Sequence, residues 1–84
     1  MPVDKHEIER RISAGMPGAQ VRVQGDDGAH FKARIVSDLF EHKRAIERHK
    51  MVYATLGDAV GREIHALTLE TLTPAEAAMV AEQD

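Results

Sequence analysis

The chain has 84 residues, of which 43% are hydrophobic and 30% charged, and its formal net charge is −3 at neutral pH. This length predicts a single globular domain, residues 1–84, and the acidic balance argues against a generally basic nucleic-acid-binding protein. The absence of cysteine excludes disulfides, thiolate metal sites and a cysteine nucleophile within the chain.

The N-terminal part predicts a helix followed by a strand. Asp4 and Glu7 have the spacing of a capping box, and Gly15 supplies a left-handed stop. We therefore expect a helix over residues 4–14. Residues 19–24 alternate polar and apolar side chains, which is typical of a half-buried strand.

The central part predicts a second strand and the longest helix. Residues 30–36 alternate after an Asp-Gly turn and complete a hairpin with the first strand. Residues 37–44 have no period and are expected to form a connector. A helix over about 44–61 follows, and its apolar face is predicted to contain Ile46, His49, Val52, Tyr53, Leu56 and Val60.

The C-terminal part predicts a third strand and a short helix. Residues 64–72 alternate again, and Thr73-Pro74-Ala75-Glu76 is a helix start, so a last helix is expected over about 74–82. Because a helical crossover joins the second and third strands, we expect these two strands to run parallel. The order α-β-β-α-β-α predicts an α+β domain with a three-stranded mixed sheet and helices packed on one face.

Five histidines are the unusual feature of the composition, and two of them open strands. His30 begins the second strand and His65 the third, so parallel pairing would bring both imidazoles to one edge of the sheet. Two imidazoles cannot complete a tetrahedral site, so a metal there would need ligands from outside the chain. On the residues alone, an exposed surface histidine at 30 and a partly covered one at 65 remain the commoner alternatives. His49 lies on the apolar helix face, where we expect a structural ring bonded to a backbone carbonyl.

No group of residues predicts catalysis, so we expect that the chain is not an enzyme. Neither serine lies in a nucleophile-elbow pattern, and the Gly-Asp-Asp-Gly segment lacks the Lys-Ser/Thr of a phosphate loop. No apolar run reaches the length of a membrane span, and the N-terminus has no signal-peptide core. We therefore expect a soluble domain in the cytoplasm.

Five segments spread over nearly the whole chain resemble the BolA family. They are Gly28-Ala29-His30-Phe31, Val36-Ser37-Asp38-Leu39-Phe40, Arg48-His49-Lys50-Met51-Val52-Tyr53, Ile64-His65-Ala66-Leu67 and Leu72-Thr73-Pro74-Ala75-Glu76. The third and fourth segments together are highly specific for that family. The short hairpin loop is more similar to the IbaG-type branch, whereas the long helix and connector are closer to BolA proper, so both branches stay open. The resemblance implies a class II KH-like fold.

The resemblance also implies a partner that supplies the missing metal ligands. BolA-like proteins handle iron–sulfur clusters and pair with monothiol glutaredoxins, and a [2Fe–2S] cluster bridges the two proteins. Glutaredoxin and glutathione supply thiolates, while His65 and His30 match the positions that supply imidazoles. The isolated chain, a monomer or weak homodimer, is expected to hold no cluster. His49 matches a characteristic family position and could alternatively shape the glutaredoxin surface.

The alternative function within the same family is DNA binding by a transcriptional regulator of stress responses. The basic patch on which this rests consists of Lys43, Arg44, Arg48 and Lys50 around Glu47, with Lys32 and Arg34 as its expected extension. Against it, KH domains clamp nucleotides with a GxxG loop between two helices. The GxxG of this chain, residues 15–18, lies between a helix and a strand, and a basic connector is more often simply a solvated surface.

Overall fold

The secondary-structure elements follow the predicted order, with one short addition. The computed structural model describes residues 4–25, 30–60, 62, 64 and 66–83. The elements are α1 (Lys5–Gly15), β1 (Gln20–Gln24), β2 (His30–Val36), the 3₁₀ helix η1 (Asp38–Phe40), α2 (Ala45–Leu56), β3 (Ala66–Leu72) and α3 (Pro74–Gln83). The predicted α+β class is confirmed. No helix in the described part of the chain is long and apolar enough to cross a bilayer.

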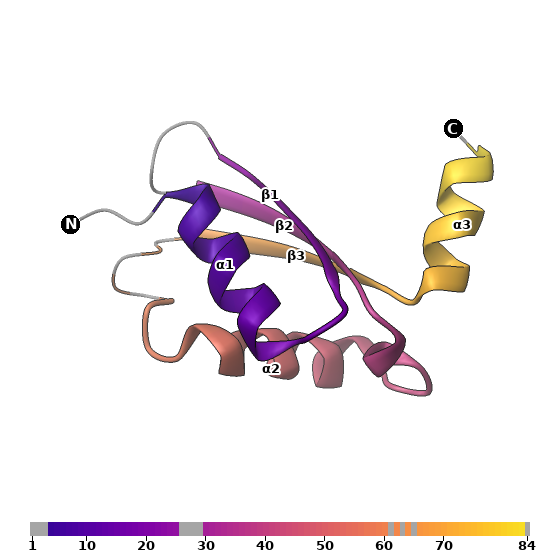
Figure 1. Cartoon of the computed structure of the whole chain (residues 1–84), viewed down its shortest axis with the longest axis horizontal. Coiled ribbons are helices and arrows are strands. Elements are labelled where there is room, and N and C mark those ends of the chain that lie inside the picture. The colour runs from indigo at the N-terminus through magenta and orange to yellow at the C-terminus, as the bar shows by residue number, and fades with distance from the viewer. Residues whose placement is uncertain (1–3, 26–29, 61, 63, 65, 84) are drawn as a thin grey trace.

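The three strands form one mixed sheet in the order β1-β2-β3. β1 and β2 pair antiparallel, as the hairpin requires, whereas β2 and β3 pair in parallel. The segment between β2 and β3 contains α2, which makes the crossover that a parallel pair needs. α1 and α2 cover one face of the sheet, and α3 stands beyond the carboxyl end of β3 (Figure 1). The predicted mixed sheet is confirmed, and the helices on its covered face are α1 and α2.

The core lies between this covered face and the two helices. Alternate residues of β2 are buried, and the residues between them are exposed on the open face of the sheet. The buried apolar side chains are Ile8, Ile12, Met16, Val23, Phe31, Ala33, Ile35, Phe40, Val52, Leu56, Ala59 and Ile64. None of them belongs to α3. The chain thus folds as two layers and leaves one face of its sheet open.

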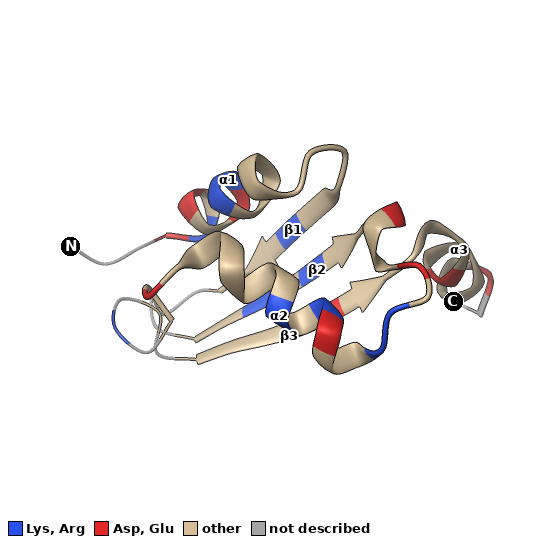
Figure 2. Ribbon diagram, turned by 90° about the horizontal axis from the view of Figure 1, so that it is seen from below, with Lys and Arg blue, Asp and Glu red and all other residues tan. Residues whose placement is uncertain are grey.

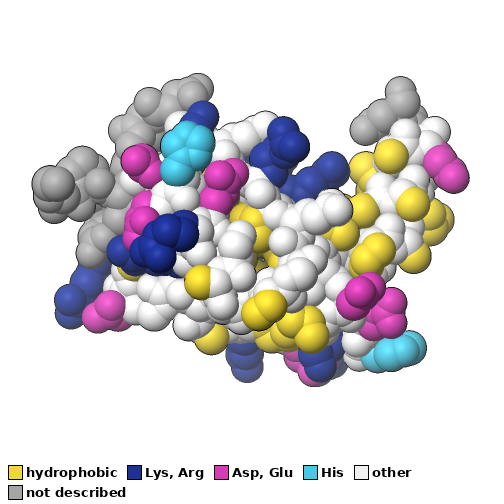
Figure 3. All heavy atoms as spheres, viewed as in Figure 1, with side chains coloured by type: hydrophobic (Ala, Val, Ile, Leu, Met, Phe, Trp, Pro, Cys, Tyr) yellow, Lys and Arg dark blue, Asp and Glu magenta, His cyan; other side chains and the backbone are white. Residues whose placement is uncertain are grey.

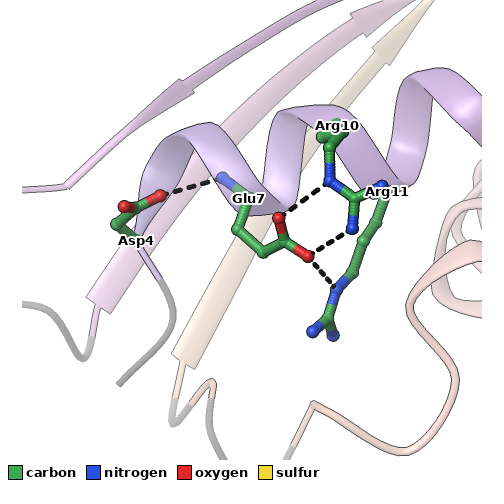
Figure 4. Close-up of polar contacts among 4 residues, drawn as sticks. All are labelled: Asp4, Glu7, Arg10 and Arg11. Atoms are coloured by element: carbon green, nitrogen blue, oxygen red, sulfur yellow. Dashed lines mark hydrogen bonds and ion pairs between the residues drawn. The ribbon is translucent and has the colours of Figure 1, made fainter. Parts of the chain in front are cut away.

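The first turn of α1 contains the predicted cap and a cluster of charges (Figure 4). The Glu7 N–H donates to Oδ1 of Asp4 at 2.9 Å, as expected of an N-cap. The Glu7 carboxylate accepts hydrogen bonds from Arg10 at 2.6 Å and from Arg11 at 3.0 Å, rather than returning to the cap backbone. These two guanidinium groups, Arg10 first, lower the pKa of Glu7 to about 2. The expected capping box is therefore half formed, because its carboxylate binds two arginines.

α2 is shorter than predicted and turns a different face to the sheet. It ends at Leu56, because Gly57 follows with φ +62°, whereas the sequence predicted a helix to residue 61. Val52 and Leu56 are buried as expected, but Ile46 is 59% and Tyr53 38% exposed. The prediction that Ile46 and Tyr53 lie on the buried face of this helix was therefore wrong.

The predicted connector, residues 37–44, contains η1 and is fastened at its first residue. The Ser37 side chain accepts a hydrogen bond from the Leu39 N–H at 3.1 Å, and the Ser37 N–H donates to the Leu72 carbonyl at 3.0 Å. Phe40 at the end of η1 is fully buried. The segment that resembles the family between residues 36 and 40 therefore anchors the end of β2 to the end of β3.

Arg48 joins the segment before α2 to β3 and α3, an arrangement that we call the Arg48 clamp. Its Nε donates to the Lys43 carbonyl at 2.9 Å, and its Nη1 donates to the Thr71 carbonyl at 3.1 Å and to Glu76 at 2.7 Å. The guanidinium also lies 5.8 Å from the centroid of the Phe40 ring. The clamp fixes the first turn of α3 to the end of the sheet.

Glu76 is also half of the predicted capping box of α3, which is complete. Its carboxylate accepts from the Thr73 N–H at 2.8 Å, and its own N–H donates to the Thr73 hydroxyl at 3.2 Å. The hydrogen bond from Arg48, followed by that from the Thr73 backbone, lowers the pKa of Glu76 below its ordinary value of 4.5. The ionised form of Glu76 is therefore favoured in the folded chain.

We expect Glu76→Gln to lower stability at neutral pH and to have a diminishing effect in acid. A carboxyl whose pKa falls on folding stabilises the folded state above its unfolded value of about 4.5, and this contribution is lost as the pH falls through the lower folded value. Thermal unfolding of both proteins between pH 7 and pH 3 should give midpoints that differ at pH 7 and converge towards pH 3. Glu82→Gln on the same helix is the matched control and should follow the parent curve. A constant difference across the pH range would contradict the clamp.

Candidate functional site

His30 lies where the sequence placed it, at the amino end of β2. Its side chain is exposed, and the next residue, Phe31, is 4% exposed within the core. The backbone of His30 pairs with that of Ala66 at the start of β3. The imidazole is therefore carried by a strand whose next residue is anchored in the core.

The approach of β1 to this end of β2 depends on Gly25. A Cβ atom at this position would lie 2.6 Å from the Phe31 ring and 2.8 Å from the His30 carbonyl oxygen. Only a residue without a side chain therefore fits beside the first residues of β2. The close packing of Gly25 against Phe31 and the His30 carbonyl therefore positions the backbone that carries His30.

His65, the second predicted ligand, lies outside the residues that the structure describes. The residues on either side of it are described: Ile64 is fully buried, and Ala66 pairs with His30. The chain segment that contains His65 therefore leads directly into the strand beside His30. The parallel pairing on which the two-histidine prediction depended is confirmed.

The described residues cannot form a complete metal site. They contain no group of three or more His, Asp or Glu side chains that could hold an ion. An exposed imidazole such as that of His30 can donate one nitrogen to a metal. A metal bound by His30 at the amino-terminal end of β2 would therefore need further ligands from outside the described residues.

His49 lies half buried on α2, close to Val52 in the sequence of that helix. Among the described residues, its ring takes part in no hydrogen bond, so the expected bond to a backbone carbonyl is absent. Its packing is compatible with a structural role or with a role at a partner surface.

Three of the four residues in the predicted basic patch are exposed, and the fourth is used inside the fold. Lys43, Arg44 and Lys50 face solvent, whereas the Arg48 side chain is 13% exposed and forms the clamp. Arg44 also forms an ion pair of 3.6 Å with Glu47. Figure 2 shows these cations along α2 and the segment before it. The patch offered to solvent is therefore smaller than predicted.

Lys32 and Arg34 do not extend this patch. Both lie on the open face of the sheet, on the same side as Arg22, whereas α2 lies on the covered face (Figures 1 and 2). The backbones of Arg22 and Arg34 are directly opposite each other, and Arg34 donates to Glu70 at 2.5 Å. Sequence reasoning missed this second basic surface, although the outward alternation of both strands was the signal for it.

The GxxG segment is part of the core packing. Met16 is 2% exposed, and its N–H donates to the Ile12 carbonyl at 2.9 Å. A Cβ atom on Gly15 would lie 2.6 Å from Cγ2 of Thr55, so this glycine allows α1 to approach α2 closely. The segment closes α1 against the core instead of presenting a free loop of the kind that clamps nucleotides in KH domains.

The family model described as BolA-like protein matches residues 5–76. The chain belongs to the BolA-like family. This confirms the resemblance found in the sequence, and proteins of this family are regulators and adaptors rather than enzymes, in agreement with the expectation for this chain.

Two curated relatives and one solved structure illustrate the relationship. The chain is 47% identical over 53 residues to SufE-like protein 1, chloroplastic/mitochondrial, of Arabidopsis thaliana, a match covering 62% of this chain and 14% of that protein. It is 44% identical over 45 residues to the DNA-binding transcriptional regulator BolA of Escherichia coli, covering 54% and 43% of the two chains. It thus matches less than half of either relative. The structure of a BolA protein homologue from Coxiella burnetii is 39% identical, has a TM-score of 0.80 and covers 90% of this chain and 97% of that one.

We expect Arg48→Met to destabilise this BolA-like domain more than Lys50→Met, although both remove one cation from α2. The first substitution leaves the Lys43 and Thr71 carbonyls and Glu76 without their shared donor, whereas Lys50 is exposed. Thermal unfolding should give a midpoint several degrees lower for Arg48→Met and a nearly unchanged one for Lys50→Met. Equal midpoints would show that the clamp does not hold α3.

Proposed function

We propose that this chain is a cytoplasmic BolA-like adaptor that pairs with a monothiol glutaredoxin and shares a [2Fe–2S] cluster with it through His30 and His65. The observation that carries the proposal is the parallel register, which puts an exposed histidine at the amino-terminal end of the central strand, next to the residue that follows His65. Membership of the BolA-like family supports the proposal. The adaptor would act in cluster trafficking or in iron, redox or stress regulation.

The two proteins would contribute different ligands to the cluster. A bound [2Fe–2S] cluster supplies one-electron redox chemistry, and imidazole ligation in place of thiolate raises its potential. This chain has no cysteine, so it can supply no thiolate, and the ligands proposed for it are the imidazole nitrogens of His30 and His65. The role of the chain is to hold His30 on a strand that Phe31 anchors in the core, with the His30 side chain exposed to solvent at the end of that strand. An imidazole binds iron only when it is neutral, so ligation should weaken in acid.

The test of the proposal is anaerobic cluster reconstitution of this chain with a monothiol glutaredoxin and glutathione. A heterodimer with charge-transfer absorption distinct from that of the glutaredoxin homodimer is expected, while this chain treated alone should acquire no cluster. A glutaredoxin spectrum that does not change on addition of this chain, together with no complex on gel filtration, would refute the proposal.

Histidine variants are expected to separate the roles of the two ligands. A ligand that is held in place before the partner binds loses less entropy on binding, and the sequence predicts His65, between Ile64 and Ala66 at the start of the third strand, as that ligand. His65→Ala should therefore abolish the shared cluster, and His30→Ala should leave a weaker or spectrally altered one. His30→Cys should support a cluster with a spectrum shifted towards thiolate ligation.

His49→Ala is the control for these variants, because its half-buried ring lies on α2 rather than at the strand edge. It should change the thermal midpoint modestly and the cluster spectrum only indirectly. If His49→Ala loses the cluster at full stability while His65→Ala keeps it, the proposed ligands are wrong.

DNA binding remains the second candidate function, because the matched relative from Escherichia coli is named a DNA-binding transcriptional regulator. The surface proposed for it is the exposed part of the basic patch, Lys43, Arg44 and Lys50. This surface is local, since the chain as a whole is acidic. A role for Arg48 in DNA contact would compete with its bonds inside the fold.

If DNA binding is the function, replacing Lys43, Arg44 and Lys50 with Gln should weaken duplex affinity and flatten its salt dependence. Each lost phosphate contact lowers the slope of log affinity against log salt by roughly one unit. Lys5→Gln, an exposed cation on α1, is the matched control and should leave the slope unchanged. Equal affinity and slope for the triple variant and the parent would eliminate this surface.

A further inference from the structure

The open face of the sheet carries a group of cations around a small hollow, which we call the cationic hollow. It has a volume of about 190 Å³ and is lined by Arg22, Gln24, Lys32, Arg34 and Glu70. The register places Arg22 of β1 directly opposite Arg34 of β2. Like charges in directly opposed positions of a sheet are destabilising. The arrangement therefore favours an anion that lies against the two strands.

Glu70 neutralises Arg34 and leaves the other two cations of this hollow in excess. Arg34 donates to Glu70 at 2.5 Å, and this hydrogen bond, ahead of the more distant charge of Lys32, lowers the pKa of Glu70. The side chains of Arg22 and Lys32 form no ion pair or hydrogen bond with another residue in the described part of the chain. The hollow therefore offers a guanidinium and an ammonium group to a ligand, and Gln24 adds an amide donor.

A second hollow, the α3 hollow, continues this surface towards α3. It has a volume of about 540 Å³ and is lined by Gln20, Val21, Arg22, Arg34, Val36 and Ala77. Figure 3 shows hydrophobic side chains on the α3 side of this hollow and Lys or Arg side chains reaching towards it from the sheet. Because both hollows are lined by the same two arginines, they form one groove with a cationic part and, at Val36 and Ala77, an apolar part.

We propose that this groove binds a phosphate monoester, with the phosphate at Arg22 and Lys32 and the esterified group in the α3 hollow. A phosphate monoester carries about two negative charges at neutral pH and three strong acceptor oxygens, which match two cations and an amide. A carboxylate brings a single charge and leaves one of the cations uncompensated. Lys32 and Val36 are four residues apart on β2, about 13 Å, which is a distance that a small aromatic ester spans.

The groove borders the end of β2 that carries His30. Lys32 lies two residues from His30, and both side chains are exposed on the open face. The phosphate is nevertheless held by side chains other than the proposed cluster ligands. Its binding needs neither iron nor glutaredoxin and is measured with this chain alone. Failure of the phosphate site would therefore leave the proposed function unaffected.

NMR titration of the full chain with naphthyl phosphate at constant ionic strength tests the proposal. Amide resonances of residues 20–24 and 32–36 should shift and saturate. Inorganic phosphate should shift the same resonances around the cationic hollow and bind more weakly, because it leaves the α3 hollow empty. Naphthoate should bind about tenfold more weakly than the ester, and naphthol should not bind. Equal affinity for the carboxylate, or shifts spread evenly over the exposed cations of both faces, would overturn the proposal.

Charge variants identify the side chains that hold the phosphate. Arg22→Gln and Lys32→Gln should each weaken binding of naphthyl phosphate by about tenfold, since each removes one charged donor. Lys50→Gln, an exposed position on α2, is the matched control and should leave the affinity unchanged. Glu70→Gln should strengthen binding, because it removes the negative charge beside the phosphate. Equal affinities for the parent, Arg22→Gln and Lys32→Gln would refute the site.

Ala77→Gln separates the two parts of the groove. Ala77 is half buried on α3, and a longer polar side chain there fills the α3 hollow. Binding of naphthyl phosphate should weaken, whereas binding of inorganic phosphate should stay the same. Thermal melts verify that this variant and the charge variants fold. Unchanged binding of the ester would show that its organic group lies outside the α3 hollow, contrary to the proposal.

Discussion

The parallel pairing of β2 with β3 is the constraint on which the placement of every surface in this domain depends. A parallel pair needs a crossover, and α2 supplies it while it buries Val52 and Leu56 against the sheet. The pairing brings the amino ends of two strands that are distant in sequence to one end of the sheet, where His30 lies beside Ala66. The carboxyl ends of the same strands meet at the other end of the sheet, where α3 begins. This register therefore separates His30 from α3 by the length of the strands.

Many residues of the family motifs hold this arrangement together instead of forming a site. Arg48 bonds two carbonyl oxygens and Glu76 with one guanidinium, a planar group whose several donors suit it to such a junction better than the ammonium of a lysine. Ser37 ties the end of β2 to Leu72, and Phe40 fills the core. A sequence match at these residues is therefore evidence for the fold rather than for a functional site. His30 differs from them, because its exposed side chain fills no place in the core.

Local signals predicted most of the fold, and tertiary packing decided the rest. β2 was predicted residue for residue, since strict alternation allows only one buried face. In α2, Ile46 and Tyr53 share the helical spacing of the buried residues, and only contact with the sheet decides which side is covered. Arg48 was predicted on the solvent side by its charge, although its long apolar stem can lie in a buried stripe. The strand-end position of His30 was predictable, and so was the outward orientation of Lys32 and Arg34, from the alternation of β2. Their separation from the α2 cations follows only when α2 is known to cover the opposite face of the sheet.

A two-layer domain of this size leaves part of its sheet uncovered, and side chains limit how that sheet can associate. At the edge of β1, the Val23 N–H donates to Glu9 at 3.0 Å, and at the edge of β3 the Thr71 carbonyl accepts from Arg48. These bonds use backbone groups that an added strand would otherwise pair with. The open face itself carries polar and charged residues, which disfavour dry stacking of a second sheet. Association is therefore directed to the face and the ends of the sheet, where charge and shape can select the partner.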